Sequence, residues 1–299
     1  VTNPPIDSLR ENKVMSLKTR FGNLGNILDF SKLTKDNIYV LNSPILSNAQ
    51  FEKFLKFFGN NNKVLDCTFS KDDDLETSIN LLKVKSEQAV REGIKQIILS
   101  DKNISENRMP MPMLLCIGAI NTHLVKLGLR GYVSINVQTG DALDTHSFAT
   151  LIGVGATTVN PYLAFDSLYQ RHSKKLFGNF TFDECVSRYI KSVNLGLLKI
   201  MSKMGISVLS SYRGGCNFET VGLSRTIVKD YFPGMLSKIS GIGLKGIEKK
   251  IRTIHKEAFF NNSNILPIGG IYRYRKNGET HQYQGCLLYT SDAADDWSS

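Results

Sequence analysis

The spacing of apolar and polar residues changes repeatedly between two periods along the chain, and this change predicts alternating strands and helices. Short apolar runs predict strands at 63–69, 94–101, 131–139, 157–162 and 206–212. Stretches with helical spacing predict helices at 74–93, 111–128, 144–156, 183–205, 224–232 and 244–260. Strands that alternate with helices are typical of βα units with a parallel sheet.

The predicted fold class is therefore α/β, with a mostly parallel sheet of βα units that forms either an open, doubly wound sheet or a partial barrel. An irregular, partly helical segment precedes it. Helices are predicted there at 8–18, where Ser8 and Glu11 have the spacing of a capping box, and at 46–59, which ends on Gly59. Between them, "RFGNLGN" contains two Gly-Asn pairs, which can adopt positive φ and direct backbone amides toward a neighbour.

Composition places the chain among ordinary globular proteins. Its 299 residues are 41% hydrophobic and 21% charged, enough for one large α/β domain or two smaller ones. No apolar run reaches the roughly 18 residues that span a bilayer, and the N-terminus lacks the apolar segment of a signal peptide. We therefore expect no membrane association. Because the chain does not begin with Met, we expect it to be a fragment.

The cysteines indicate a reducing compartment. Cys67, Cys116, Cys185, Cys216 and Cys286 show no C-x-x-C spacing and do not form the even set of a short secreted protein. They are predicted to be free thiols of a cytoplasmic protein.

The formal net charge of +10 raises the question of nucleic-acid binding. The lysines, however, are spread along helical faces beside acidic residues, as in "GLKGIEKKIRTIHKE". This pattern favours a solvated basic surface, or one that faces an acidic partner domain, and we expect no nucleic-acid partner.

The last stretch, 286–299, breaks the pattern of the rest. Its sequence "CLLYTSDAADDWSS" contains the single Trp and resembles a translated sequencing adapter. We interpret it as a non-native tail and exclude it from the fold prediction.

Polar residues follow four of the predicted strands, and chemistry in parallel α/β folds gathers at these carboxyl ends. The four groups are Asp101-Lys102, Thr139-Gly140-Asp141, Asn160-Pro161-Tyr162 and Tyr212-Arg213-Gly214-Gly215-Cys216-Asn217. In the last group, Cys216 precedes a helix predicted to start near Asn217, whose N-terminus would lower the pKa of a thiol. No histidine lies beside it in the sequence, so a structural cysteine is favoured over a nucleophile.

Other arrangements of chemical groups are weaker. "TGDALDTHSFATLIGVGA" and "SGIGLKGIEKKI" place glycines before a helix and could bind phosphate, but neither is a complete phosphate-binding motif, so close packing is favoured. Asp144 and His146 do not share a helix face, and no metal site is predicted. Arg213, Glu219 and Arg225 are predicted to form a charge network that orders the loop at 212–219.

Longer stretches resemble a known family. "VTNPPIDSLRE", "LSDKNISENRMPMPMLL", "INTHLVKLGLR", "LDTHSFATLIGVGATTVNPYLA" and "LLKIMSKMGISVLSSYRGG" are similar, in order, to the central domain of glutamate synthase large subunits, and "SKISGIGL" and "LPIGGIYRYRKNGETH" extend the similarity. The resemblance covers 1–285. It implies one central domain, made of the N-terminal segment 1–60, a βα core at 61–262 and a linker at 263–285 toward an FMN domain.

In that family a glutaminase domain with a cysteine nucleophile releases ammonia, which passes through a tunnel to a (β/α)8 domain that holds FMN and a 3Fe-4S cluster. There L-glutamate is formed from 2-oxoglutarate. The resemblance implies that this chain connects those two domains, helps to wall the tunnel, carries no catalytic, cofactor-binding or metal-binding residue, and is inert alone. The residues look nearer to bacterial NADPH-type enzymes, which implies NADPH as the electron source through a small subunit that contains FAD.

A tunnel wall for neutral ammonia requires backbone carbonyls and small polar side chains rather than charged catalytic groups. The candidate tunnel or interdomain-loop residues are Asn23, Asn26, Tyr212, Arg213, Gly214, Gly215, Asn217 and Glu219. The alternative prediction is a self-contained (β/α)-barrel oxidoreductase that binds flavin or phosphate, which the alternation of strands and helices also permits.

Overall fold

The computed structural model describes residues 4–22, 28, 38–260, 268–270 and 274–279. The chain divides into two compact units, 1–255 and 256–299. The elements, contacts and cavities described below belong to the first unit, except that the last helix runs on into the second.

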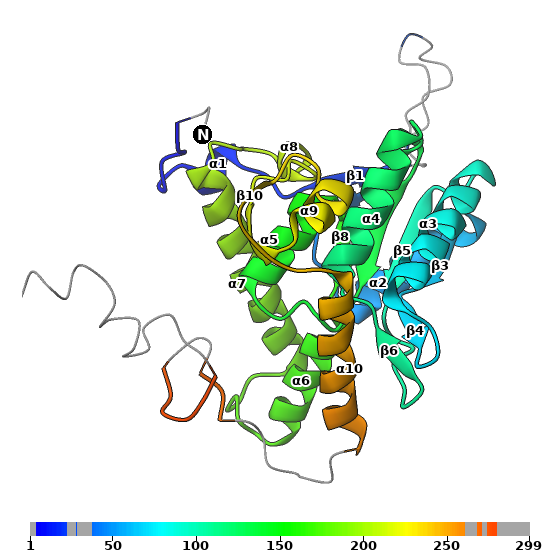
Figure 1. Cartoon of the computed structure of the whole chain (residues 1–299). Helices are drawn as coiled ribbons and strands as arrows, with labels where there is room; N and C mark the ends of the chain where they lie inside the picture. Colours follow the sequence, from blue (N-terminus) through cyan, green and yellow to red (C-terminus); the bar gives the residue numbers. More distant parts are fainter. Residues whose placement is uncertain (1–3, 23–27, 29–37, 261–267, 271–273, 280–299) are drawn as a thin grey trace, which may run out of the picture. The chain divides into compact units, whose positions relative to one another are not determined.

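A four-stranded parallel sheet forms the centre of the fold (Figure 1). Its strands lie in the order β3 (Asn62–Asp66), β5 (Gln96–Ser100), β7 (Ser134–Gln138) and β8 (Thr158–Asn160). The connecting helices are α3 (Leu75–Arg91), α4 (Met113–Lys126) and α5 (Thr145–Val154). Because strand order follows chain order without reversal, the sheet winds in one direction and is not doubly wound. The α/β class with parallel βα units is confirmed, and the described strands do not close a barrel.

The two faces of this sheet have different chemistry. Leu65, Leu99, Val137 and Val159 project to one face and join the main hydrophobic core with the helices. The next residues along each strand project to the opposite face. There Ile98 packs in a second, smaller core with Phe54 and Phe58.

Helix α2 (Asn48–Phe58) supplies most of that smaller core. A complete capping box starts it, in which Gln50 N–H donates to the Ser47 hydroxyl and Ser47 N–H donates to the Gln50 side chain. Its phenylalanines pack against the antiparallel strands β1 (Thr19–Phe21) and β2 (Tyr39–Leu41). The Phe21 and Phe54 rings meet edge to face, 5.2 Å between centroids.

The remaining elements complete the described part of the chain. They are α1 (Glu11–Val14), β4 (Thr68–Ser70), β6 (Arg108–Pro110), α6 (Tyr162–Ser173), α7 (Phe182–Lys203), α8 (Leu209–Tyr212), β9 (Glu219–Leu223), α9 (Arg225–Tyr231), β10 (Leu236–Ile242) and α10 (Leu244–Phe260), together with the 3-10 turns η3 (Gly59–Asn61) and η4 (Arg130–Tyr132). Strands β4 and β6 pair antiparallel, and β9 and β10 pair parallel. Strands β1, β2, β6, β9 and β10 and helices α6 and α8 were not predicted from the sequence.

The predicted strand at 206–212 is wrong. The position beside β8 is taken by residues 44–46, because Val159 N–H donates to the Pro44 carbonyl at 2.8 Å and Leu46 N–H donates to Val159 at 2.9 Å. The segment at 206–212 instead makes a single bridge, from Val208 to Ser16, and then turns into α8.

The predicted helix at 8–18 is also wrong in extent. Helix α1 is one turn long, begins after Arg10 and has no side-chain cap. The Glu11 carboxylate does not close a capping box with Ser8. It accepts hydrogen bonds from Lys199 at 2.9 Å and Ser202 at 2.8 Å, so tertiary partners on α7 replace the predicted local one.

Helices α4 and α9 approach closely at a glycine. A Cβ atom on Gly118 would lie 2.5 Å from the Phe232 ring and 2.7 Å from the Tyr231 carbonyl oxygen. Since the second of these is backbone, the two elements would have to move apart to admit a side chain.

We expect Gly118→Ala to destabilise the chain by about 1–3 kcal/mol, because overpacking outweighs the higher helix propensity of alanine. The free energy of unfolding from denaturant titration measures this. Gly131→Ala is the matched control, since no atom lies within 4 Å of a Cβ placed there, and it should change stability by less than about 0.5 kcal/mol. Equal stability of the two variants would contradict the close approach.

Candidate functional site

Three of the four predicted groups of polar residues meet at the carboxyl edge of the sheet. Asp101 follows β5 and is almost completely buried. The Thr139 hydroxyl, which follows β7, donates to Asp101 Oδ2 at 2.5 Å, and Gly140 N–H donates to both carboxylate oxygens at 3.1 and 3.2 Å. The Tyr162 hydroxyl, after β8, lies close enough to this carboxylate for each group to shift the pKa of the other. The Asp101 carboxylate therefore lies where the ends of three strands meet.

The surroundings of Asp101 favour its protonated form. Burial raises the pKa of Asp101, the hydrogen bond from Thr139 opposes this shift, and the nearby charge of Asp141 adds to it. Burial and Asp101 also raise the pKa of the Tyr162 hydroxyl, which stays a neutral donor.

The loop after β7 has little capacity left for a ligand. Gly140 N–H is used by Asp101, Asp141 N–H donates to the Thr139 hydroxyl at 3.0 Å, and Asp141 Oδ2 accepts from Met113 N–H at 3.1 Å. The carboxylates of Asp141 and Asp144 both belong to this loop and would repel a phosphate. The phosphate-binding interpretation of "TGDALDTHSFATLIGVGA" is not favoured.

A row of neutral polar side chains lies on the sheet face beneath α2, and the sequence analysis missed it. Asn136 Nδ2 donates to Gln96 and Thr158 donates to Asn136, at 3.0 and 2.7 Å. Next to them, Ser100 donates to Gln138 at 2.9 Å, and Gln138 donates to Asn160 at 3.2 Å. Alternating polar positions in "SINVQ" were the available signal, since every second residue of a strand faces the same side.

This polar row ends beside a cavity. Asn160 Nδ2 donates to the Leu46 carbonyl at 3.0 Å and to Asn48 at 2.9 Å. Asn48, Ser47 and Gln50 then line a cavity of about 430 Å³ between the start of α2 and helices α6 and α7. A second cavity, of about 420 Å³, lies at the amino edge of the sheet, where Gln96 begins the row. The walls of the first cavity are neutral apart from Asp183.

The fourth predicted group, at 212–217, does not join the carboxyl edge. The Tyr212 side chain is buried, and its hydroxyl donates to the Ala149 carbonyl at 3.0 Å. Gly214 N–H donates to Ile152 at 3.1 Å, and Cys216 N–H donates to Gly153 at 3.0 Å. These bonds fix the loop against the end of α5, where carbonyls lack intrahelical partners. Gly214, Gly215 and Asn217 remain exposed.

The helix predicted to start near Asn217 is wrong, because strand β9 follows instead. Cys216 has a left-handed backbone conformation, with φ of 50°, and burial raises the pKa of its thiol. The pKa of this thiol is thus shifted in the direction opposite to that expected at a helix N-terminus. The geometry thus does not favour Cys216 as a nucleophile.

Two guanidinium groups lie near the end of α5. Arg130 donates to Asn121, to the Val133 carbonyl and to the Gly155 carbonyl, at 2.7, 2.6 and 3.0 Å. Burial, with a smaller effect from the charge of Arg213, lowers the pKa of Arg130 to about 10. Burial also lowers the pKa of Arg213. The negative end of the helix dipole favours both cations.

The predicted charge network of Arg213, Glu219 and Arg225 is not formed. Glu219 pairs with Lys238 on the neighbouring strand β10, 3.3 Å between Nζ and Oε1. Backbone hydrogen bonds, rather than ion pairs, order the loop. Asn23 and Asn26, the other candidate residues, lie outside the described residues.

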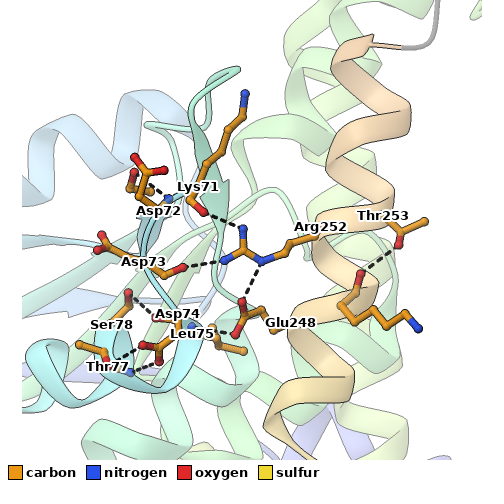
Figure 2. Close-up of polar contacts among 12 residues, drawn as sticks. Lys71, Asp72, Asp73, Asp74, Leu75, Thr77, Ser78, Glu248, Arg252 and Thr253 are labelled. Atoms are coloured by element: carbon orange, nitrogen blue, oxygen red, sulfur yellow. Dashed lines mark hydrogen bonds and ion pairs between the residues drawn. The ribbon is translucent and has the colours of Figure 1, made fainter.

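A network of hydrogen bonds joins helix α10 to the loop between β4 and α3 (Figure 2). Arg252 donates to the Lys71 and Asp73 carbonyls at 2.8 and 2.6 Å, and its Nε donates to Glu248 at 2.7 Å. The second oxygen of Glu248 accepts from Leu75 N–H at 3.1 Å. The helix that follows β10 is thereby tied back to the first βα unit.

The part of the chain that the structure describes holds no group of three or more His, Cys, Asp or Glu side chains placed to bind a metal ion. Within the same residues, no helix combines the length and apolar character that crossing a bilayer requires.

Comparison with known proteins gives a consistent family. A family model for the glutamate synthase central domain matches residues 1–224. The glutamate synthase (NADPH) large chain of Azospirillum brasilense is 48% identical over 297 residues, which cover 98% of this chain and 20% of that protein. The large chain of the Bacillus subtilis NADPH enzyme is 39% identical over 293 residues, covering 97% and 19%.

The similarity extends to ferredoxin-dependent enzymes. Ferredoxin-dependent glutamate synthase 1 of Arabidopsis thaliana is 36% identical over 297 residues, which cover 94% of this chain and 18% of that protein. The chain thus spans about a fifth of the length of these curated relatives.

Asp101→Asn should change how stability depends on pH. Because the folded-state pKa of Asp101 is raised above the ordinary 3.8, the folded chain holds a proton that the unfolded chain has lost, and folding stability falls as pH rises from about 4. Asparagine has no such proton. The free energy of unfolding of the wild type, relative to the variant, should therefore decrease from pH 4 toward neutrality in denaturant titrations.

Asp74→Asn is the control of opposite sign. Asp74 caps α3, and hydrogen bonds from Thr77 lower its pKa, so its stabilising effect is present above about pH 3.8 and is lost as pH falls. If both variants gave the same slope, the raised pKa of Asp101 would be refuted.

Arg252→Gln should loosen α10. Loss of two charge-assisted bonds to carbonyls is expected to cost about 1–3 kcal/mol and to speed amide hydrogen exchange in 247–255. Lys249→Gln, on the exposed side of the same helix, should alter stability by less than about 0.5 kcal/mol. Unchanged exchange in the Arg252→Gln chain would show that the network does not hold the helix.

Proposed function

The chain belongs to the glutamate synthase central-domain family, and we propose that it is the connecting domain of a glutamate synthase large chain. The observation that carries this proposal is the 48% identity across 98% of the chain to a large chain of which it spans only 20%. In the complete protein it links a glutaminase domain to an FMN domain that also holds a 3Fe-4S cluster. The chemistry of L-glutamate synthesis then belongs to those neighbours, and the isolated chain is inert.

The proposed second role is to wall a path for ammonia. Ammonium is a poor nucleophile, so a path between two reaction centres must exclude water and avoid groups that protonate the ammonia. Neutral hydroxyl and amide groups along the polar row, and around the cavity at the start of α2, support this role. In the loop at 212–219, Asn217 offers an exposed amide, while Tyr212 holds the loop in place.

The electron donor is proposed to be NADPH, delivered through a small subunit that contains FAD. The higher identity to the two bacterial NADPH large chains, 48% and 39% against 36% for the Arabidopsis ferredoxin-dependent enzyme, supports this choice. The proposed location is cytoplasmic, and the free cysteines Cys67, Cys116, Cys185 and Cys216 support it.

The rival function, a self-contained flavin- or phosphate-binding barrel, has less support. The described strands form an open sheet, and the glycine amide after β7 is already bonded to Asp101. The visible absorbance of the purified chain separates the two: the connecting domain should carry no flavin, and a bound stoichiometric flavin would favour the rival.

Asn217→Leu in the full-length large chain tests the path. We expect the ratio of glutamine hydrolysed to glutamate formed to rise, because ammonia escapes where the polar wall is lost. Both rates are measured in the same assay. Asn12→Leu, an exposed asparagine on α1, is the control and should leave the ratio unchanged. Fully coupled rates in the Asn217→Leu enzyme would remove this loop from the path.

A further inference from the structure

Strands β9 and β10 form a small parallel sheet whose large aliphatic side chains face solvent. Val221 is 64% exposed, and Leu236, Ile239 and Ile242 are 66%, 61% and 46% exposed. Val221 and Ile239 are direct partners across the two strands, and Leu236 and Ile242 lie three residues to either side of Ile239 on β10; we call these four exposed side chains the β9–β10 patch.

An exposed two-stranded parallel sheet of this kind is unusual in a complete protein. Parallel sheets are ordinarily covered on both faces, and a pair of strands alone is marginally stable in water. Among the strands that the structure describes, β9 and β10 pair only with each other. The Ser237 hydroxyl, on β10, is buried without a hydrogen-bond partner within the same residues.

The pair is nonetheless a defined element. Helix α9 packs beside both strands, Ser224 N–H donates to the Ile242 carbonyl at 2.9 Å, and the Glu219–Lys238 ion pair crosses the strands. Gly241 lets the two backbones approach, because a Cβ atom there would collide with the backbone of Gly222 on β9. The exposed patch is therefore presented by a fixed scaffold.

The place of this sheet in the sequence indicates what covers it. The match to the central-domain family ends at Ser224, directly after β9, whereas similarity to the large chains continues through β10. About four-fifths of those large chains lies outside the present chain. The sheet thus joins the last strand of the matched domain to the first strand beyond it.

We propose that the β9–β10 patch is the docking surface for the domain that follows in the same large chain, which covers Val221, Leu236, Ile239 and Ile242 with apolar side chains. This inference rests on the proposed function as a connecting domain. The covering surface is apolar, because the four exposed side chains are aliphatic and the charged residues Glu219 and Lys238 on the same strands already pair with each other.

Hydrogen exchange measured by mass spectrometry tests the proposal. Peptides that cover 219–223 and 236–242 should exchange about tenfold or more slowly in the full-length large chain than in the 299-residue chain. Strands β5 and β7 serve as the internal control for folding and should be protected in both.

Substitutions identify the patch as the cause. Ile239→Lys in the full-length chain should abolish the added protection of 236–242. Val84→Lys on α3, which removes an aliphatic side chain of similar exposure, 59%, should leave it intact. The result for Ile239→Lys is interpreted only if β5 and β7 stay protected, which shows that the variant is folded. The comparison of the two unmodified chains does not depend on any variant.

Equal exchange of 236–242 in both unmodified chains would overturn the proposal. So would light scattering that shows a dimer of the 299-residue chain which Ile239→Lys dissociates, since a second copy would then be the occupant. The ratio of glutamine hydrolysis to glutamate formation, measured on the same samples, reports the proposed function separately: an uncoupled enzyme with a protected β10 would refute the ammonia path and leave the docking surface in place.

Discussion

The contact of residues 44–46 with the outer edge of β8 determines how this domain is built. Hydrogen bonds on both sides of Val159 occupy the edge at which a fifth strand would have joined, so the sheet stops at four strands. The same contact brings Asn160 to the Leu46 carbonyl and places the start of α2 over the polar face. Loss of this contact would expose a sheet edge and uncover the smaller core at once.

The polar centre of the fold follows from that arrangement. With α2 held over one face, the polar side chains of that face need partners inside the fold. Asn136 bonds to Gln96 and Thr158 on the neighbouring strands, and Asn160 bonds to Gln138 on the sheet and to Asn48 on α2. A parallel α/β protein commonly keeps reactive groups free at the carboxyl edge of its sheet. Here the Asp101 carboxylate instead accepts hydrogen bonds from Thr139 and Gly140. An edge used in this way supports structure, which is consistent with the connecting role proposed for this chain.

Local signals predicted the elements whose determinants are local. Capping residues and apolar spacing gave helix α2 within two residues, and α10 at its observed bounds. Prediction failed where residues distant in the sequence determine the local structure or the partner of a side chain. Apolar spacing at 206–212 resembles a strand, but the sheet edge was already taken by residues 44–46. Glu219 lies close in sequence to Arg213, yet Lys238 on a strand absent from the prediction is its partner. The three strand ends that meet at Asp101 were predictable because parallel strands bring their carboxyl ends together.

The positions of unpaired polar groups and of exposed apolar side chains also bear on function. Inside the described domain almost every buried polar side chain has a partner, and Ser237 is the exception within those residues. The open features lie outside: the aliphatic side chains of β9 and β10, the exposed amide of Asn217 and the excess of basic over acidic groups. This distribution fits the proposed docking of another domain of the large chain, and the apolar β9–β10 patch, next to the end of the family match at Ser224, is where that domain is expected.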